Sequence, residues 1–310
     1  MNKKNITKEL LSLLKSLVKI DTSFPPGNSE DFDRFIRNYL KKSGLTINSY
    51  YDKDKKKLNT VIKNFKGNSK SLVFNSHIDT VKPILEEWST NPFSLKITNK
   101  YSFGLGSVNC KSSAAVHLLV AKNLKKNFPK LKEKISFTFV TSEENLGPEG
   151  TLYLRKKNVN VHKSTISIGI IKGGENINVV PYKAEILIDR RITSKENIKL
   201  SFTHLKKFIT NFEPSAKVKF LTGTNSFKSN PKNFYLASLK NSYKLVKRKN
   251  PIYLSSIGVS DGRYFSDENV DIINVGPGSG DEGHKSNEKL LNSDIKDYYL
   301  ILKNFLSKLK

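Results

Sequence analysis

Short apolar runs and amphipathic segments of helical period follow one another from the start of the chain. Each kind of segment must bury one apolar face, and strands that alternate with helices do so by packing in layers. Strands are expected at 45–51, 59–65, 71–76, 94–98 and 134–144, and helices at 7–19, 29–43 and 112–125. Ser29 is the expected N-cap of the second helix. The alternation predicts an α/β fold with a mixed sheet.

The middle of the chain has a different order of elements. Residues 163–230 read as strand, strand, helix and strand, which is enough for a small companion domain of α+β type. Its elements are expected at 164–174, 183–193, 195–212 and 216–223. A helix at 234–248, strands at 252–256 and 270–275 and a helix at 293–309 would then rejoin the main sheet. We therefore expect a discontinuous main domain, residues 1–162 and 231–310, with the companion domain inserted in it.

The net charge of +26 arises from 54 Lys and Arg residues against 28 Asp and Glu residues. Seven of the 54 are arginine, and the lysines are spread through every segment instead of forming one cluster. Frequent Lys, Asn and Ile together indicate a codon bias toward A and T more than a selected binding surface. We expect no nucleic-acid partner. Association with nucleic acid through the lysines stays an alternative, and it predicts tight binding that weakens with salt.

Features of the N-terminus and the cysteine content indicate the compartment. Leu10, Leu14 and Leu17 recur at helical spacing and no small-residue cleavage site follows, so an amphipathic helix is expected instead of a signal peptide. Lysines interrupt every apolar run before it reaches the length of a membrane span. The single cysteine, Cys110, excludes an intrachain disulfide and is typical of a reducing compartment. We expect a cytoplasmic protein without membrane contact.

An imidazole and a carboxylate directly follow one apolar strand. His77 and Asp79 are two residues apart, so they would share one face of an extended chain. A metal-binding histidine commonly gives its second ring N–H to a carboxylate, which fixes the tautomer. The pair is suited to metal binding, although a hydrogen-bonded structural histidine would leave the same pattern.

Two adjacent carboxylates, Glu143 and Glu144, end the strand expected at 134–144. They would repel each other if both were buried without a cation. Because consecutive residues at a strand edge point in different directions, one could bind a metal while the other faces a water molecule. A water-activating hydrolase needs that combination. A solvated acidic turn is the alternative reading of these two residues alone.

Three glycine-containing segments complete the set. They are GLGSVNCKSSAA at 104–115, SDGRYF at 260–265 and GPGSGDEGHKSNEKL at 276–290. The last of them places His284 in a glycine-rich loop, where its imidazole could reach a metal. Together with the segments that contain His77 and Glu143, they make five segments in this order, which are more informative than any one of them.

On the segments SHIDTVKP, WSTNPF, GLGSVNCK, FVTSEENLGPEGT, NVVP, SDGR and HKSNE, the chain resembles the M20 family of dinuclear-zinc metallopeptidases and deacylases. The resemblance implies a zinc-peptidase-like catalytic domain with a shortened companion lid, and a small-molecule N-acyl amino-acid substrate. It also implies zinc as the cofactor, as one or two ions, with cobalt or manganese able to substitute. A homodimer is implied as well, weakened by the shortness of the companion domain.

Carried over residue by residue, the resemblance assigns roles to the residues of the five segments. His77 becomes a ligand of one zinc, and Asp79 becomes its orienting partner. Glu144 and His284 become ligands of the second zinc. Glu143 becomes the general base that holds the attacking water.

The resemblance also implies substrate contacts and a reaction. Arg263 and Asn178 fall in the segments SDGR and NVVP, which the resemblance places at the substrate, and a guanidinium suits a carboxylate. SDGR, HKSNE and TSEE followed by GT favour removal of a succinyl group from N-succinyl-diaminopimelate, in lysine biosynthesis. SHIDTVKP and GLGS are equally similar to N-acetylornithine and N-acetyl-lysine deacetylases. A catalytically impaired homologue that at most binds a ligand is the alternative from another class.

The sequence departs from the family pattern in two places. Asn109 stands where the family has a metal-bridging aspartate, and its amide offers one ligating oxygen and no negative charge. It is expected to be a weak ligand shared by the two metals. Residues 145–172 form an interval far shorter than in the family, and 151–172 contain no Asp or Glu that could replace the family's further zinc-binding acid. His162, the one histidine of this interval, is expected to be structural.

Overall fold

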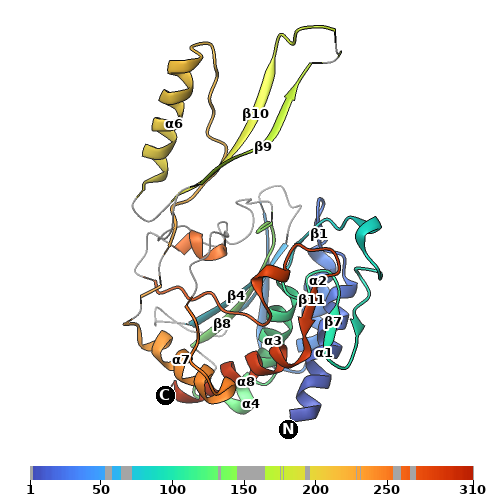
Figure 1. Ribbon diagram of the computed structural model, residues 1–310. Helices are drawn as coiled ribbons and strands as arrows, with labels where there is room; N and C mark the ends of the chain where they lie inside the picture. The colour runs from blue at the N-terminus through green and yellow to red at the C-terminus, as the bar shows by residue number, and fades with distance from the viewer. Residues whose placement is uncertain are drawn as a thin grey trace. The chain divides into compact units, whose positions relative to one another are not determined.

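The computed structural model shows a chain that packs into two compact units (Figure 1). It describes residues 3–52, 58–63, 72–131, 134–144, 165–174, 176, 178–192, 196–227, 229–230, 232–253, 260–265 and 270–309. The first unit comprises Met1–Arg155, Asn230–Ile252 and Ile273–Lys310, and the second comprises Lys156–Ser229 and Tyr253–Ile272. The second unit thus includes 253–272, which the sequence pattern places in the main domain. The division into a catalytic and a companion domain stays a prediction.

A four-stranded mixed sheet lies at the centre of the first unit. In spatial order its strands are β2 (Thr46–Tyr51), β3 (Leu58–Lys63), β8 (Ile135–Val140) and β4 (Leu72–His77). The β2–β3 and β3–β8 pairs are antiparallel, whereas β4 and β8 run parallel with His77 beside Val140. Both parallel strands therefore end at one edge of the sheet. The predicted α/β fold with a mixed sheet is confirmed.

Helices cover this sheet and supply most of the core of the first unit. They are α1 (Lys3–Lys19), α2 (Glu30–Leu40), α3 (Lys111–Lys122), α4 (Leu124–Asn127), α7 (Phe234–Lys247) and α8 (Asn292–Lys308). Every residue of α3 from Lys111 to Ala121 is buried, as expected of a helix enclosed on all sides. It contacts β4, β8, α1 and α8. The predicted helices at 7–19, 112–125, 234–248 and 293–309 are confirmed.

Short strands between residues 96 and 103 form a small sheet with a strand near the C-terminus of the chain. In a three-stranded sheet, β7 (Tyr101–Phe103) lies between β6 (Lys96–Ile97) and β11 (Lys289–Leu291), with antiparallel pairing. A separate parallel pair joins β1 (Ser23–Phe24) to β5 (Thr80–Val81). The pairing of β11 with β7 brings residues 284–288 beside the glycine turn that precedes α3.

The second unit contains a hairpin and a helix. β9 (Thr165–Gly173) pairs with β10 (Ala184–Arg191), and the register shifts between Leu187 and Ile188. Asn197 caps α6 (Ile198–Phe212) by accepting hydrogen bonds from the N–H groups of Lys199 and Leu200. Among the described residues, the strands predicted at 216–223 and 270–275 are wrong, because neither segment pairs with a neighbouring strand. Residues 254–256 of the strand predicted at 252–256 lie outside the described residues.

Ser29 precedes α2 as an N-cap would, but its hydroxyl makes no capping hydrogen bond. Instead it accepts a hydrogen bond of 2.8 Å from the backbone N–H of Leu58. Ser29 is thus the N-cap residue of α2 as predicted, but its side chain joins the start of the helix to β3 instead of capping it. Within the described part of the chain, no helix is both long enough and apolar enough to span a bilayer.

A histidine on α3 is buried in a hydrogen-bonded group of neutral side chains. His117 Nδ1 lies 2.7 Å from Ser76 Oγ, and Nε2 lies 3.2 Å from the hydroxyl of Tyr298. Burial lowers the pKa of His117 to about 3. As the pH falls below about 6.5, the unfolded chain takes up a proton that the folded chain refuses until near pH 3. This histidine therefore reduces stability in acid.

Replacing His117 by glutamine should make the free energy of unfolding less dependent on pH. The wild-type slope between pH 6 and 4 should exceed that of the variant by about 1.4 kcal/mol per pH unit, since one proton is involved. Urea unfolding at several pH values measures the slopes. His204→Gln, at an exposed position of α6, is the matched control. Equal slopes for wild type and His117→Gln would show that this side chain is protonated in the folded state as well.

Candidate metal centre

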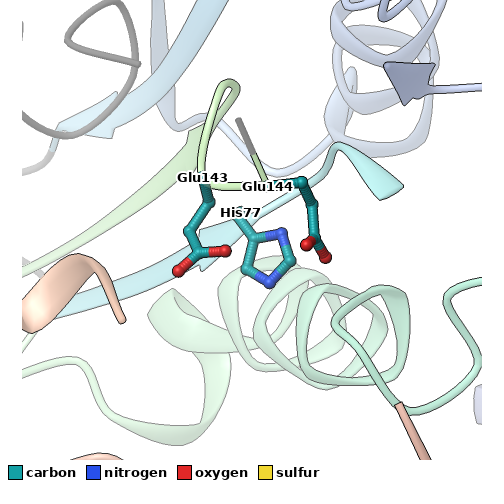
Figure 2. Close-up of side chains that lie close together, drawn as sticks. All are labelled: His77, Glu143 and Glu144. Atoms are coloured by element: carbon teal, nitrogen blue, oxygen red, sulfur yellow. The ribbon is translucent and has the colours of Figure 1, made fainter. Parts of the chain in front are cut away.

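Three side chains meet at the edge where the parallel strands end. His77 is the last residue of β4, and Glu143 and Glu144 follow β8 closely. One ligand atom from each lies within 4.8 Å of the other two. Figure 2 shows the imidazole of His77 between the two carboxylates. His77 and Glu143 are buried and Glu144 is half-buried, so the two adjacent carboxylates repel each other here and a bound cation would stabilise them.

A backbone turn, and not the strand expected to continue through 144, places both glutamates at this edge. β8 ends at Val140, and Ser142 has a φ of 66°. A left-handed conformation is unusual for a residue with a side chain and commonly occurs at functional sites. It ends the extended backbone just before the turn that contains Glu143 and Glu144. Both carboxylates consequently face the same site.

Asp79 holds His77 and the glutamate turn together. The N–H at Nδ1 of His77 faces the backbone carbonyl of Asp79 at 3.1 Å, and the Asp79 carboxylate lies 3.6 Å from the same nitrogen. The other carboxylate oxygen accepts a hydrogen bond of 2.9 Å from the N–H of Glu144. Burial alone would lower the pKa of His77, but Cys110, Asp79 and Glu143 outweigh it and raise the pKa. The Nε2 atom of His77 is left facing the site.

Asn109 and His284 complete the cluster. Asn109 Oδ1 lies 3.0 Å from His77 Nε2, and Asn109 Nδ2 lies 2.8 Å from both Glu144 Oε1 and His284 Nε2. His284 Nε2 is also 2.9 Å from Glu144 Oε2. The hydrogen bond to Glu144 raises the pKa of His284, while partial burial opposes it. The structure thus brings together His77, Asn109, Glu143, Glu144 and His284.

Glu288 fixes the turn that carries Asn109, although no role was predicted for it from the sequence. Its buried carboxylate accepts hydrogen bonds from the backbone N–H groups of Gly106, Val108 and Asn109 at 2.8, 2.6 and 2.8 Å. Gly106 has a φ of 78°, and a Cβ there would lie 2.9 Å from Thr80. Glu288 belongs to the segment HKSNE, and its position four residues after His284 was the available signal.

The loop that carries His284 is fixed by contacts with residues 87–89. Asn287 accepts hydrogen bonds from the N–H and hydroxyl of Ser89 and donates one to the backbone carbonyl of Glu87. The hydroxyl of Ser286 donates to the carboxylate of Glu87. His284 itself has a φ of 65°. These contacts hold the imidazole toward Glu144.

The two residues expected to bind substrate lie in the second unit. Arg263 is buried in a short 3-10 helix, η2 (Asp261–Phe265), where it donates a hydrogen bond of 2.7 Å to the hydroxyl of Tyr264. Asn178 is exposed in a turn between β9 and β10. Their roles stay predictions. His162 and residues 145–151 of the segment FVTSEENLGPEGT lie outside the described residues.

The donor atoms of the cluster fit a divalent transition metal. Imidazole nitrogen together with carboxylate oxygen is the donor set that zinc prefers, and a neutral amide oxygen can complete it. Cobalt and manganese accept the same donors. Several ligand-type atoms within 4.8 Å of one another can converge on one ion with small side-chain adjustments.

Comparison with known proteins gives one family and several relatives. A model of peptidase family M20/M25/M40 matches residues 73–308. A succinyl-diaminopimelate desuccinylase from Wigglesworthia glossinidia brevipalpis is 23% identical over 381 aligned residues, covering 96% of this chain and 99% of the relative. That alignment exceeds the 310 residues of this chain, so the relative carries segments that this chain lacks. An N-formyl-4-amino-5-aminomethyl-2-methylpyrimidine deformylase from Halalkalibacterium halodurans is 31% identical over 147 residues, 46% of this chain and 34% of the relative.

Solved structures share the fold over the whole chain. A metallo-carboxypeptidase of the M20 family from Sulfolobus solfataricus has a TM-score of 0.77 at 12% identity, with 96% of this chain and 98% of that chain covered. A dinuclear metal-binding peptidase of the same family from Bacillus subtilis has a TM-score of 0.69 at 14% identity, with 98% of both chains covered.

Proposed function

The chain belongs to peptidase family M20/M25/M40, and on that premise we propose that it is the amide hydrolase that removes the succinyl group from N-succinyl-diaminopimelate. Lysine biosynthesis in the cytoplasm is the proposed setting. The observation that carries the proposal is the convergence of His77, Glu143 and Glu144 within 4.8 Å at the end of two parallel strands. The similarity to a desuccinylase over 96% of the chain supports the choice of substrate.

Each residue of the centre has a proposed part in the reaction. A zinc ion, replaceable by cobalt or manganese, would be held by His77, Glu144 and the amide oxygen of Asn109 and would supply Lewis acidity to the amide carbonyl. His284 is the proposed ligand of any second ion. Glu143 accepts a proton from the attacking water and delivers it to the leaving amine. Asp79 orients His77 through its ring N–H.

Substrate recognition is assigned to groups of the second unit. The guanidinium of Arg263 pairs with a carboxylate of the substrate, since its planar fork matches two carboxylate oxygens. Asn178 is a further proposed contact. Both assignments rest on the family resemblance of the segments SDGR and NVVP.

Assay of the zinc- or cobalt-loaded protein tests the proposal. N-succinyl-diaminopimelate should be hydrolysed with a kcat/KM at least tenfold above that for N-acetylornithine. Release of free amine from each substrate measures the two rates. Preferential hydrolysis of N-acetylornithine would move the specificity to the deacetylases. Turnover of neither substrate by metal-loaded protein would contradict the proposal and favour a homologue that has lost catalysis.

A further inference from the structure

We propose that this chain holds one metal ion tightly at a centre where a dinuclear relative of the same fold holds two. The inference rests on the proposed function only in taking the cluster of His77 and Glu144 as a metal centre. A carboxamide, Asn109, lies between the ligand-type groups and divides them. Its oxygen faces His77, and its nitrogen faces Glu144 and His284.

The carboxamide of Asn109 can offer a metal-ligating atom on only one of its two sides. An amide has one ligating oxygen, and its NH₂ group donates two hydrogen bonds but offers no lone pair to a cation. In the arrangement seen here, the oxygen is directed to the His77 side at 3.0 Å from Nε2. Rotating the amide by half a turn would give the oxygen to Glu144 and His284 and present N–H to His77 instead. Either orientation completes the ligands of one ion only.

The side-chain NH₂ group of Asn109 already faces the side of the centre where Glu144 and His284 lie. Nδ2 of Asn109 donates a hydrogen bond of 2.8 Å to Glu144 Oε1, and it lies 2.8 Å from His284 Nε2, the nitrogen that also faces Glu144. The partial positive charge of the amide thus lies where a second cation would have to approach these two groups. His77, the Asn109 oxygen and the Glu144 carboxylate remain for the single ion, since a carboxylate oxygen of Glu144 lies within 4.8 Å of a ring nitrogen of His77.

Charge also favours a single ion. Two divalent cations repel each other four times as strongly as two unit charges at the same distance. A carboxylate between them would offset part of that repulsion, whereas the neutral amide adds no negative charge. The backbone of Asn109 is held by the buried Glu288, which accepts a hydrogen bond of 2.8 Å from its N–H, so a shift of the turn does not carry the amide out of the site.

Metal stoichiometry tests the inference without any substrate. The full chain is saturated with zinc, freed of loosely bound metal by desalting, and analysed by elemental mass spectrometry and by calorimetric titration of the metal-free protein. We expect one ion per wild-type chain. Asn109→Asp should bind two, with the second ion held at least tenfold more tightly than any second ion in the wild type.

A variant with the same change in net charge shows whether the additional ion depends on position 109 or only on the added negative charge. Asn233 caps α7 by accepting hydrogen bonds from the N–H groups of Tyr235 and Leu236, and aspartate serves equally well as an N-cap. Asn233→Asp should therefore fold and keep one ion. Two tightly held ions in the wild type, or none, would overturn the inference, as would an Asn109→Asp variant that gains no ion. If that variant does not fold, the wild-type stoichiometry decides alone. Loss of turnover with one ion bound would refute the proposed substrate and leave the single-ion centre standing.

Discussion

Glu143→Gln is expected to lower kcat for amide hydrolysis by about a hundred- to ten-thousandfold, the usual contribution of a positioned general base. Glutamine has nearly the same shape but cannot accept the proton from water at neutral pH. Because the metal is assigned to His77 and Glu144, the metal content of the variant should stay at the wild-type value. Steady-state rates and elemental analysis of the same preparations measure both quantities.

Glu86→Gln is the matched control for this variant, because Glu86 is an exposed carboxylate of η1 (Leu85–Glu87) and lies outside the cluster. It should retain the wild-type rate. A Glu143→Gln rate within tenfold of the wild type would remove this residue from the general-base role. Loss of metal together with activity would make Glu143 a ligand instead of the base.

Glu288→Ala is expected to have the largest effect on stability among the residues around the centre. The substitution leaves the N–H groups of Gly106, Val108 and Asn109 without their acceptor inside the protein. Each buried donor that loses its partner costs about 1–3 kcal/mol, so the free energy of unfolding should fall by about 3–6 kcal/mol if water enters only partly. Urea unfolding of the metal-free protein measures the change directly.

Asp281→Ala provides the comparison, since Asp281 is an exposed acid of η3 (Gly280–Glu282) in the same segment. A change of about 0.5 kcal/mol or less is expected there. Glu288→Gln should fall between the two, because an amide keeps one acceptor oxygen but turns an NH₂ group toward a backbone N–H. A loss below about 1 kcal/mol for Glu288→Ala would mean that the turn holds its shape without this carboxylate.

The sequence predicts those parts of the centre that belong to regular elements. Strand period and the buried run before His77 place this residue at the end of β4, and helical period places α3 and α8. These signals are local, because they depend on which face of an element is buried. The family resemblance then connects His77 with Glu143, Glu144 and His284, which no local pattern could do.

The parts that the sequence does not predict depend on tertiary hydrogen bonds and on backbone angles. Ser142 gives no sign in the sequence that its φ is positive, so the turn that aligns the two glutamates was expected to be a strand. The hydroxyl of the N-cap residue Ser29 bonds to Leu58 instead of to its own helix, and that partner lies 29 residues away. The acceptor role of Glu288 likewise depends on N–H groups about 180 residues earlier in the chain. Hydrogen bonds between residues so far apart in the sequence leave no periodic pattern from which they could be predicted.

The long separation between the halves of the centre has a consequence during protein synthesis. Asn109 and Glu288 are 179 residues apart, and the turn that carries Asn109 gains its buried acceptor when β11 has paired with β7. A ribosome-bound chain that has completed β8 already contains His77, Asn109 and both glutamates, but the carboxylate that fixes the Asn109 turn has not yet been translated. We therefore expect tight metal capture to be a late event in biogenesis. Once captured, the ion stabilises only chains whose C-terminal segment has docked, and so it favours completed molecules over partly folded ones.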